Sequence, residues 1–177
     1  MKRLFVATAF AASTFAAHSH EVDVSLIWYS FSPVERAVFN SQSFPAGKYE
    51  GIIDFEEFEA WCAEVTQTLK FNVDYKYDLV DATPSPMTSA LQAIGAFDLG
   101  GNVTNATESA AVQLDIWRVL DGQQPLHNYA QNSSVKVHYL RNQWHQDLVY
   151  FTEVQEPTTL ALFGATLIGM FFLRKKS

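Results

Sequence analysis

Two residues of this 177-residue chain, Cys62 and Gln113, carry the functional groups of an internal thioester. A cysteine thiolate can attack the carbonyl carbon of a glutamine side chain with loss of ammonia, which leaves an electrophilic carbon for an external nucleophile. Such a bond needs protection from water, and the aromatic residues Trp61 and Trp117 lie close in sequence to the two positions. Cys62 is the only cysteine of the chain, so it has no partner for an intramolecular disulfide.

Gln113 falls in the middle of the apolar stripe of an expected helix. The stripe follows i, i+3, i+4, i+7 spacing and consists of Ala110, Gln113, Leu114, Trp117 and Leu120 or Asp121. A buried primary amide without a hydrogen-bond partner is unfavourable by about 1–3 kcal/mol. We therefore expect another group to contact this side chain.

Simpler interpretations of both residues stay open. Cysteine is often buried as a small hydrophobic residue, and hydrogen bonds to the backbone of a strand would satisfy Gln113. Cys62 could also pair between two chains, which the sequence neither favours nor excludes.

The elements that must position these residues are strands, then two helices, then strands. Alternating apolar residues and β-forming residues predict strands at 22–28, 51–65, 71–80, 135–140 and 148–151. Residues 99–104 are expected to form a connector. The sequence predicts an α+β domain, mainly antiparallel β, with the two helices inserted in the middle of the chain.

Capping residues mark both helices. Ser85 is a suitable N-cap for a helix that ends near Phe97. Asn105 and Glu108 have the spacing of a capping box at the start of the second helix, which should end before Gly122. The second helix contains Gln113.

The segments around the two thioester candidates resemble the thioester domain of bacterial surface adhesins. The resemblance rests on Trp61-Cys62-Ala63-Glu64 and on the helix Gln113-Leu-Asp-Ile-Trp117, and it spans about residues 51–122. Residues 110–120 also resemble the corresponding helix of PEP-CTERM proteins that carry this domain. The resemblance implies a thioester between Cys62 and Gln113.

Three residues are candidates for shielding the bond: Trp61, Glu64 and Trp117. The chain also shows two departures from the family pattern. Val112 stands where the adhesins usually have threonine, and Asp115 stands where a small apolar residue is usual.

The first residues of the chain have the pattern of a secretory signal. Lys2-Arg3 is followed by an apolar stretch, Leu4 to Phe15, and then by small residues. This is the pattern of a cleavable signal peptide, which we assign to residues 1–19. The exported domain is then expected at residues 20–154, a length typical of a single domain.

The last residues contain a short apolar run followed by positive charges. The run, residues 160–173, precedes Arg174, Lys175 and Lys176, as the positive-inside rule expects. Fourteen residues at about 1.5 Å each cover about 21 Å of a hydrocarbon core about 30 Å thick. A transmembrane helix at about 158–173 that serves as a transient sorting signal fits this length better than a permanent anchor.

Residues 155–177 also resemble the PEP-CTERM sorting segment of exported proteins from Gram-negative bacteria that make extracellular polysaccharide. Glu156 and Pro157 match its tripeptide, and Gln155 stands where the first proline is usual. The resemblance implies that a precursor is held in the inner membrane and cleaved by an exosortase-type enzyme near Glu156-Pro157. The protein would then reach the cell surface or the extracellular matrix. A tail anchor of no special family is the alternative.

The charge of the central domain limits its partners. The whole chain has a net charge of −7, and five of its twelve basic residues belong to the two terminal segments, so residues 20–154 are more acidic still. Nucleic acid and anionic membrane surfaces need a basic face. We therefore expect neither as a partner of the domain.

The sequence has no clear motif for a metal site or for a common catalytic site. The histidines His127, His138 and His145 lack metal-ligand spacing. A cluster of acidic residues would alternate between the two faces of a strand and lacks a calcium-loop motif: Asp54, Glu56, Glu57 and Glu59. Hydrolase and kinase motifs are also missing. We predict no metal, no cofactor and no enzymatic activity.

Three functions remain from the sequence. The first is covalent attachment of a surface protein to a matrix polysaccharide or a surface protein target. The second is a non-covalent structural or glycan-binding role in the matrix, in which Tyr29, Trp144 and Tyr150 stack on sugars. The third is an enzyme whose catalytic residues are not recognised.

Overall fold

The computed structural model describes residues 19–65, 67 and 69–154. The sorting segment at 155–177 and all of the expected signal peptide except Ser19 lie outside the described residues. In the part of the chain that is described, no helix is long and apolar enough to cross a membrane.

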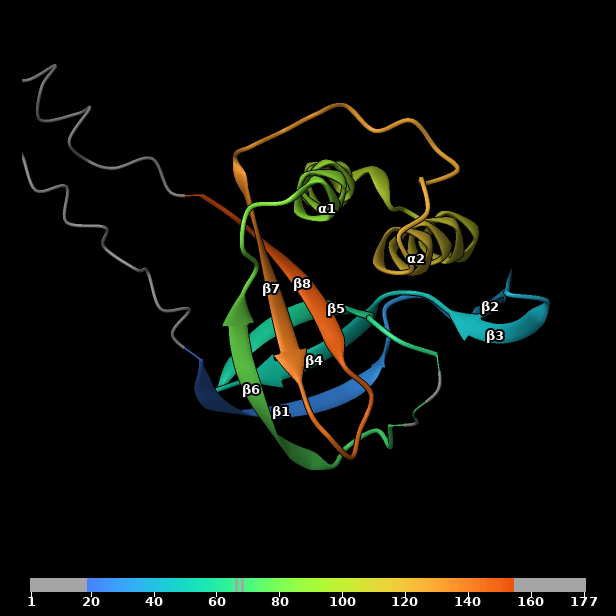
Figure 1. Ribbon diagram of the computed structural model, residues 1–177. Coiled ribbons are helices and arrows are strands. Elements are labelled where there is room, and N and C mark those ends of the chain that lie inside the picture. Colours follow the sequence, from blue (N-terminus) through green and yellow to red (C-terminus); the bar gives the residue numbers. More distant parts are fainter. Residues whose placement is uncertain (1–18, 66, 68, 155–177) are drawn as a thin grey trace, which may run out of the picture.

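Six antiparallel strands close into a barrel (Figure 1). They are β1 (His20–Tyr29), β4 (Tyr49–Ile53), β5 (Glu56–Cys62), β6 (Asp74–Asp81), β7 (Val135–Arg141) and β8 (Leu148–Glu153). Their order around the barrel is β1-β4-β5-β8-β7-β6. The expected α+β class with a mainly antiparallel sheet is confirmed.

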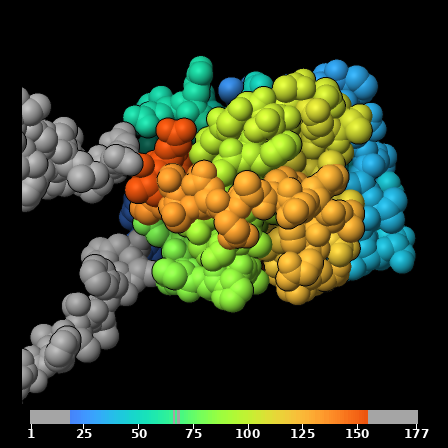
Figure 2. Space-filling model, turned by 90° about the horizontal axis from the view of Figure 1, so that it is seen from above, coloured from blue at the N-terminus to red at the C-terminus, as the bar shows by residue number. Residues whose placement is uncertain are grey.

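The other elements lie on one side of the barrel. They are the hairpin β2 (Glu35–Phe39) and β3 (Gln42–Ala46), the helices α1 (Pro86–Phe97) and α2 (Ala106–Leu120), and the short π-helical turn η1 (Asp98–Asn102). The helices lie above the barrel, and the hairpin packs beside α2 (Figure 1). Figure 2 shows the helical side, where the segment between α2 and β7 runs over the helices.

The two predicted helix starts are confirmed by their caps. The Ser85 hydroxyl accepts a hydrogen bond from the Thr88 backbone N–H at 3.0 Å. At the second helix, the Asn105 side chain accepts from the Glu108 N–H at 3.0 Å, and the Glu108 carboxylate accepts from the Thr104 N–H at 2.7 Å. Each cap satisfies backbone donors that have no partner inside the helix.

Two hairpin turns differ from the sequence expectation. Residues 51–65 do not form one strand, because the chain reverses at Asp54 (φ 47°) and Phe55 (φ 74°) between β4 and β5. A second reversal at Asn40 and Ser41, also with positive φ, forms the β2-β3 hairpin that the sequence did not reveal. Such turns are usually recognised by a glycine, and neither has one.

Two apolar cores meet at the end of β5. One fills the barrel and includes Cys62, whereas the other lies between barrel and helices and includes the neighbouring Trp61. Adjacent strand residues point to opposite faces, which explains the separation. Strand β5 joins β8 through only two residue pairs, Trp61 with Val149 and Cys62 with Leu148. Cys62 therefore lies where the barrel closes.

We expect Gly95→Ala to destabilise the domain, although alanine favours helix by up to about 1 kcal/mol. A Cβ at Gly95 would lie 2.6 Å from ring carbons of the buried Phe151 and 3.0 Å from Val135. Overpacking of this kind typically outweighs the propensity gain, so the free energy of unfolding should fall by about 1–2 kcal/mol. Urea unfolding checks this. Ser89→Ala on the exposed face of α1 is the control and should change stability little, and equal stability of the two variants would contradict the packing described.

Candidate functional site

The side-chain amide of Gln113 pairs with the backbone of Cys62. The Cys62 N–H donates to Gln113 Oε1 at 3.0 Å, and Gln113 Nε2 donates to the Cys62 carbonyl at 2.8 Å, across 51 residues of sequence. Gln113 is fully buried. Both hydrogen bonds run from α2 to the last residue of β5, so the two thioester candidates lie together. They meet through hydrogen bonds between the Gln113 side chain and the backbone of a strand. Such bonds are also the simpler explanation of how the buried Gln113 amide is satisfied.

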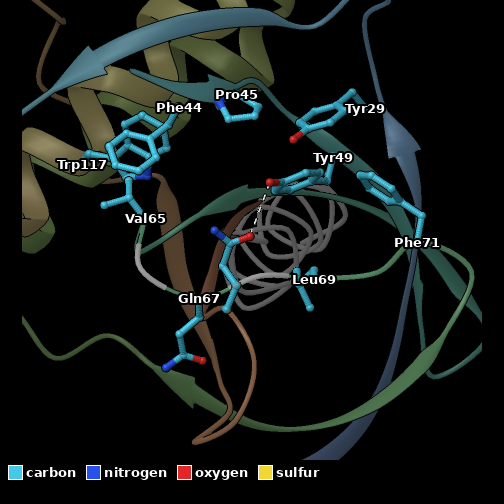
Figure 3. Close-up of a pocket in the computed structure, with 10 residues that line it drawn as sticks. Tyr29, Phe44, Pro45, Tyr49, Val65, Gln67, Leu69, Phe71 and Trp117 are labelled. Atoms are coloured by element: carbon cyan, nitrogen blue, oxygen red, sulfur yellow. Dashed lines mark hydrogen bonds between the residues drawn. The ribbon is translucent and has the colours of Figure 1, made fainter. Parts of the chain in front are cut away.

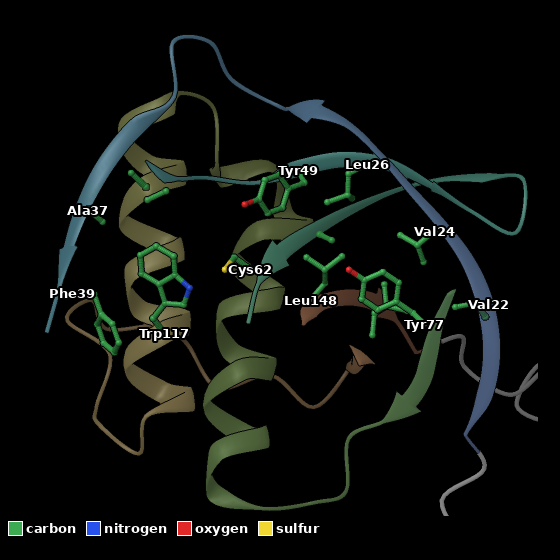
Figure 4. Close-up of a cluster of buried hydrophobic side chains, with 14 residues drawn as sticks. Val22, Val24, Leu26, Ala37, Phe39, Tyr49, Cys62, Tyr77, Trp117 and Leu148 are labelled. Atoms are coloured by element: carbon green, nitrogen blue, oxygen red, sulfur yellow. The ribbon is translucent and has the colours of Figure 1, made fainter. Parts of the chain in front are cut away.

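The sulfur of Cys62 has contacts of its own. The thiol donates to the Glu64 carbonyl oxygen, and Gln146 Nε2 lies 2.6 Å from Sγ. The same Nε2 donates to the Glu64 carbonyl at 2.7 Å. The nitrogen edge of the Trp117 indole faces the sulfur (Figure 4), and Trp117 Nε1 has no hydrogen-bond partner among the described residues.

The surroundings keep the thiol protonated. Burial raises the pKa of Cys62 to about 12, while Trp117, the Glu64 backbone and Gln146 act in the opposite direction. A group with so high a pKa is almost entirely thiol at neutral pH. Attack by the sulfur therefore requires a base that accepts its proton during the reaction.

Glu64 supplies a carboxylate near the thiol. Its Oε1 is buried and has no hydrogen-bond partner among the described residues. Burial and the charge of Asp147 raise the pKa of Glu64, which makes this carboxylate a stronger base. Its charge also contributes to the raised pKa of Cys62. The side chain is only partly buried.

An aromatic hollow of about 200 Å³ shares two of its lining residues with the surroundings of the thiol (Figure 3). Its lining is apolar, aromatic or neutral polar: Tyr29, Phe44, Pro45, Tyr49, Val65, Gln67, Leu69, Phe71, Trp117 and Gln146. Two of these residues, Trp117 and Gln146, also contact or face the sulfur. No charged residue lines the hollow in the described part of the chain, and Cys62 itself is not among its lining residues.

The β2-β3 hairpin holds Trp117 in place. The rings of Phe39 and Phe44 lie 5.9 and 6.0 Å from the indole, centroid to centroid. Trp117 is 3% exposed as a result. The hairpin thus completes the cover on the α2 side of the thiol, and it was not predicted from the sequence.

Trp61 lies on the other side of β5 and anchors the strand. Its indole N–H donates to Asp98 Oδ2 at 2.9 Å, and Asp98 Oδ1 lies 3.1 Å from the buried Lys48 ammonium. Lys48 also contacts Glu59 at 2.6 Å. Burial opposes the charge of Lys48, but the two carboxylates outweigh it and raise the pKa of Lys48. Trp61 thus fixes the strand that carries Cys62 instead of covering the sulfur.

The departure at Asp115 has a structural explanation. Its carboxylate is fully buried and accepts from the backbone N–H groups of Leu126 and His127, from the His127 ring, and from the Tyr129 hydroxyl at 2.9 Å. Asp115 therefore anchors the segment after α2. A small apolar side chain at this position would lack the oxygens to do so.

The histidines lie apart, each with its own contacts. His127 contacts Asp115, His138 lies between Asp81 and Thr152, and His145 packs on Tyr75. Among the described residues, no group of three or more His, Cys, Asp or Glu side chains is arranged to hold a metal ion.

Gln146 is the site residue that the sequence did not indicate. It lies in the loop before β8, 84 residues from Cys62, and only 8% of it is exposed. It belongs to neither motif of the resemblance. Gln146 is recognised as a site residue only in the folded structure, where its side chain contacts Cys62, the only cysteine of the chain.

No family model matches the chain, and neither a curated protein nor a solved structure shows significant similarity to it. The function is therefore inferred from the geometry around Cys62 and from the residues themselves.

We expect Asp115→Ala to lower the free energy of unfolding by about 2–4 kcal/mol, because it removes a buried carboxylate that accepts from the partly buried donors of Leu126, His127 and Tyr129. The segment 122–134 should also become more sensitive to limited proteolysis. Asp121→Ala is the matched control, since Asp121 is exposed at the end of the same helix and accepts only from Gln123. Equal loss of stability in both variants would contradict the anchoring role of Asp115.

Proposed function

We propose that this protein is an exported surface or matrix protein that attaches covalently to its target through a thioester between Cys62 and Gln113. The observation that carries the proposal is the pairing of the buried Gln113 amide with both backbone groups of Cys62. The adhesin-like motifs around the two residues support it.

The contacts suit the bond-forming step. Sγ of Cys62 attacks Cδ of Gln113, and negative charge develops on Oε1. The Cys62 N–H already donates to this oxygen at 3.0 Å, so it would stabilise the oxyanion. The C–N bond then breaks and ammonia leaves. The product is one thioester and one ammonia from one thiol and one amide.

The proton of the thiol must reach the leaving nitrogen. The buried, unpartnered oxygen of Glu64 is suited to accept it from sulfur, because the pKa of Glu64 is raised. Protonation converts the amide nitrogen into a leaving group. Glu64 thereby acts as a proton carrier in this proposal, a more specific role than shielding.

The target reaction regenerates the thiol. An amine or hydroxyl of the target attacks the thioester carbon, an amide or ester to Gln113 forms, and the sulfur leaves and takes up the proton. The aromatic hollow is the route for this nucleophile in the proposal, because Trp117 and Gln146 line it and also face or contact the sulfur. Its aromatic and aliphatic side chains limit the access of competing water to the bond. Each molecule reacts once, so the protein is not an enzyme in the usual sense.

Export and sorting belong to the same proposal. The signal peptide at residues 1–19 would direct the chain across the inner membrane, and the segment at 155–177 would hold it there until an exosortase-type enzyme cleaves near Glu156-Pro157. The target would be a matrix polysaccharide or a surface protein of the extracellular layer.

A non-covalent matrix role is the alternative, with one observation in its favour. Trp144 is 77% exposed and available for stacking on a sugar. The other two aromatic candidates are less available, since Tyr29 lines the hollow and Tyr150 stacks on His138. Polymer binding that survives Cys62→Ala and is lost in Trp144→Ala would favour this role.

The thioester predicts a mass deficit. The chain beginning at His20, measured intact, should be lighter than its sequence mass by one ammonia. Methylamine should add to it, and peptide mapping should place the methylamide on Gln113. Cys62→Ala should have the full sequence mass and take up no methylamine, because it removes the only cysteine.

Two results would count against the proposal. A full sequence mass together with a free, alkylatable Cys62 would exclude the thioester. A methylamide on Gln146 in place of Gln113 would show that the sulfur reacts with the other nearby amide. Gln113→Glu is a further control, since it has the same shape and is the product that hydrolysis of the thioester would leave.

A further inference from the structure

The amide of Gln146 lies directly on the sulfur of Cys62. Its Nε2 is 2.6 Å from Sγ and 2.7 Å from the Glu64 carbonyl oxygen, and the thiol donates to that same oxygen. Three groups thus contact one another in a small buried cluster. Gln113, in contrast, contacts the backbone of Cys62, and its side-chain amide is the group that the sulfur attacks in the proposed reaction.

The loop before β8 holds Gln146 firmly in this position. The buried Tyr77 hydroxyl donates to the Gln146 carbonyl at 2.8 Å. The next residue, Asp147, accepts from the Ala63 N–H through its carbonyl and from the Asn142 N–H through its side chain, both at 2.8 Å. The bond from Ala63 ties the loop to the segment just after Cys62, the bond from Tyr77 ties it to β6, and the bond from Asn142 lies within the loop itself. The side chain is therefore anchored at its base before its amide reaches the sulfur.

We propose that Gln146 is a positioning residue for the Cys62 sulfur, which it orients and stabilises as thiolate during the formation and the opening of the thioester. This inference rests on the proposed function. The N–H of Gln146 would donate to the sulfur as it loses its proton and attacks Gln113. The same N–H would stabilise the thiolate that leaves when the nucleophile of the target attacks.

The contact to Glu64 gives Gln146 a second effect on the closed bond. When the thioester forms, the sulfur loses its hydrogen and no longer donates to the Glu64 carbonyl. Gln146 Nε2 already donates to that oxygen, so the carbonyl stays satisfied. An apolar side chain at this position would leave it buried without a partner, which is unfavourable. With Gln146 present, the thioester can therefore form while the Glu64 carbonyl keeps a hydrogen-bond donor.

The closed fraction and the reaction rate test the proposal. The variant is Gln146→Met in the chain beginning at His20, because methionine has a similar length and no N–H donor. We expect the fraction with the ammonia deficit to fall, and methylamine to open the remaining thioester about tenfold more slowly, as the loss of one hydrogen bond to a charged atom implies. Gln143→Met, the same substitution at an exposed position of the same loop, should match the wild type.

A spectroscopic measurement separates this proposal from the proposed function. In Gln113→Glu, which cannot lose ammonia, the S–H stretching band in the infrared reports Cys62 alone, since the chain has one cysteine. Adding Gln146→Met should shift this band, and adding Gln143→Met should not. An unshifted band would overturn the role of Gln146 even if the thioester exists. If the wild-type chain has no thioester, the proposed function fails and the band still decides whether Gln146 holds the sulfur.

Near-ultraviolet circular dichroism and the unfolding midpoint show whether each variant is folded. Should Gln146→Met fail to fold, Gln146→Asn replaces it, since the shorter amide remains polar but does not reach the sulfur. A folded Gln146→Asn with wild-type closure, wild-type aminolysis and an unshifted band would overturn the proposal. The proposal stands if closure, aminolysis and the band all change.

Discussion

The site depends on one constraint: a fully buried glutamine amide must find hydrogen-bond partners. Gln113 finds them on the backbone of Cys62, and two hydrogen bonds thereby fix α2 to the end of β5. Other contacts follow from this docking. Trp117, one turn further along α2, is brought over the sulfur, and the β2-β3 hairpin packs on its outer side. A thiol, an amide and an aromatic cover are thus assembled around a single buried pair.

Most buried charged groups around the site are paired with an opposite charge or accept several hydrogen bonds. Buried charges are paired, as for Lys48 with Asp98 and Glu59, or accept several hydrogen bonds, as for Asp115. The groups that lack partners among the described residues include Trp117 Nε1 and Glu64 Oε1, and both belong to residues around the thiol. Unsatisfied groups are unfavourable for folding. The other two unpartnered groups among the described residues are Ser30 Oγ and Gln67 Oε1.

Much of the secondary structure could be predicted from the sequence, because its signals are local. Ser85 and Asn105 cap the two helices where expected, and the alternation in β1 and β6 gives their inward faces. The turn at Asp54-Phe55 and the β2-β3 hairpin were missed, since their positive φ angles occur without glycine. Trp61 was expected beside the thiol but lies on the other face of β5, a consequence of strand alternation at its last two residues.

The sequence by itself determined the helix caps, the strand pattern, the acidic charge and the identity of the two residues that could form a thioester. Only the tertiary structure decided that Cys62 and Gln113 meet, that they do so through the Gln113 amide and the Cys62 backbone, and that Gln146 contacts the sulfur. The reason is distance along the chain. Caps and alternation act within a few residues, whereas the contacts of Cys62 join segments 51 and 84 residues apart. Contacts across such separations are set by how the barrel closes and how the helices pack on it.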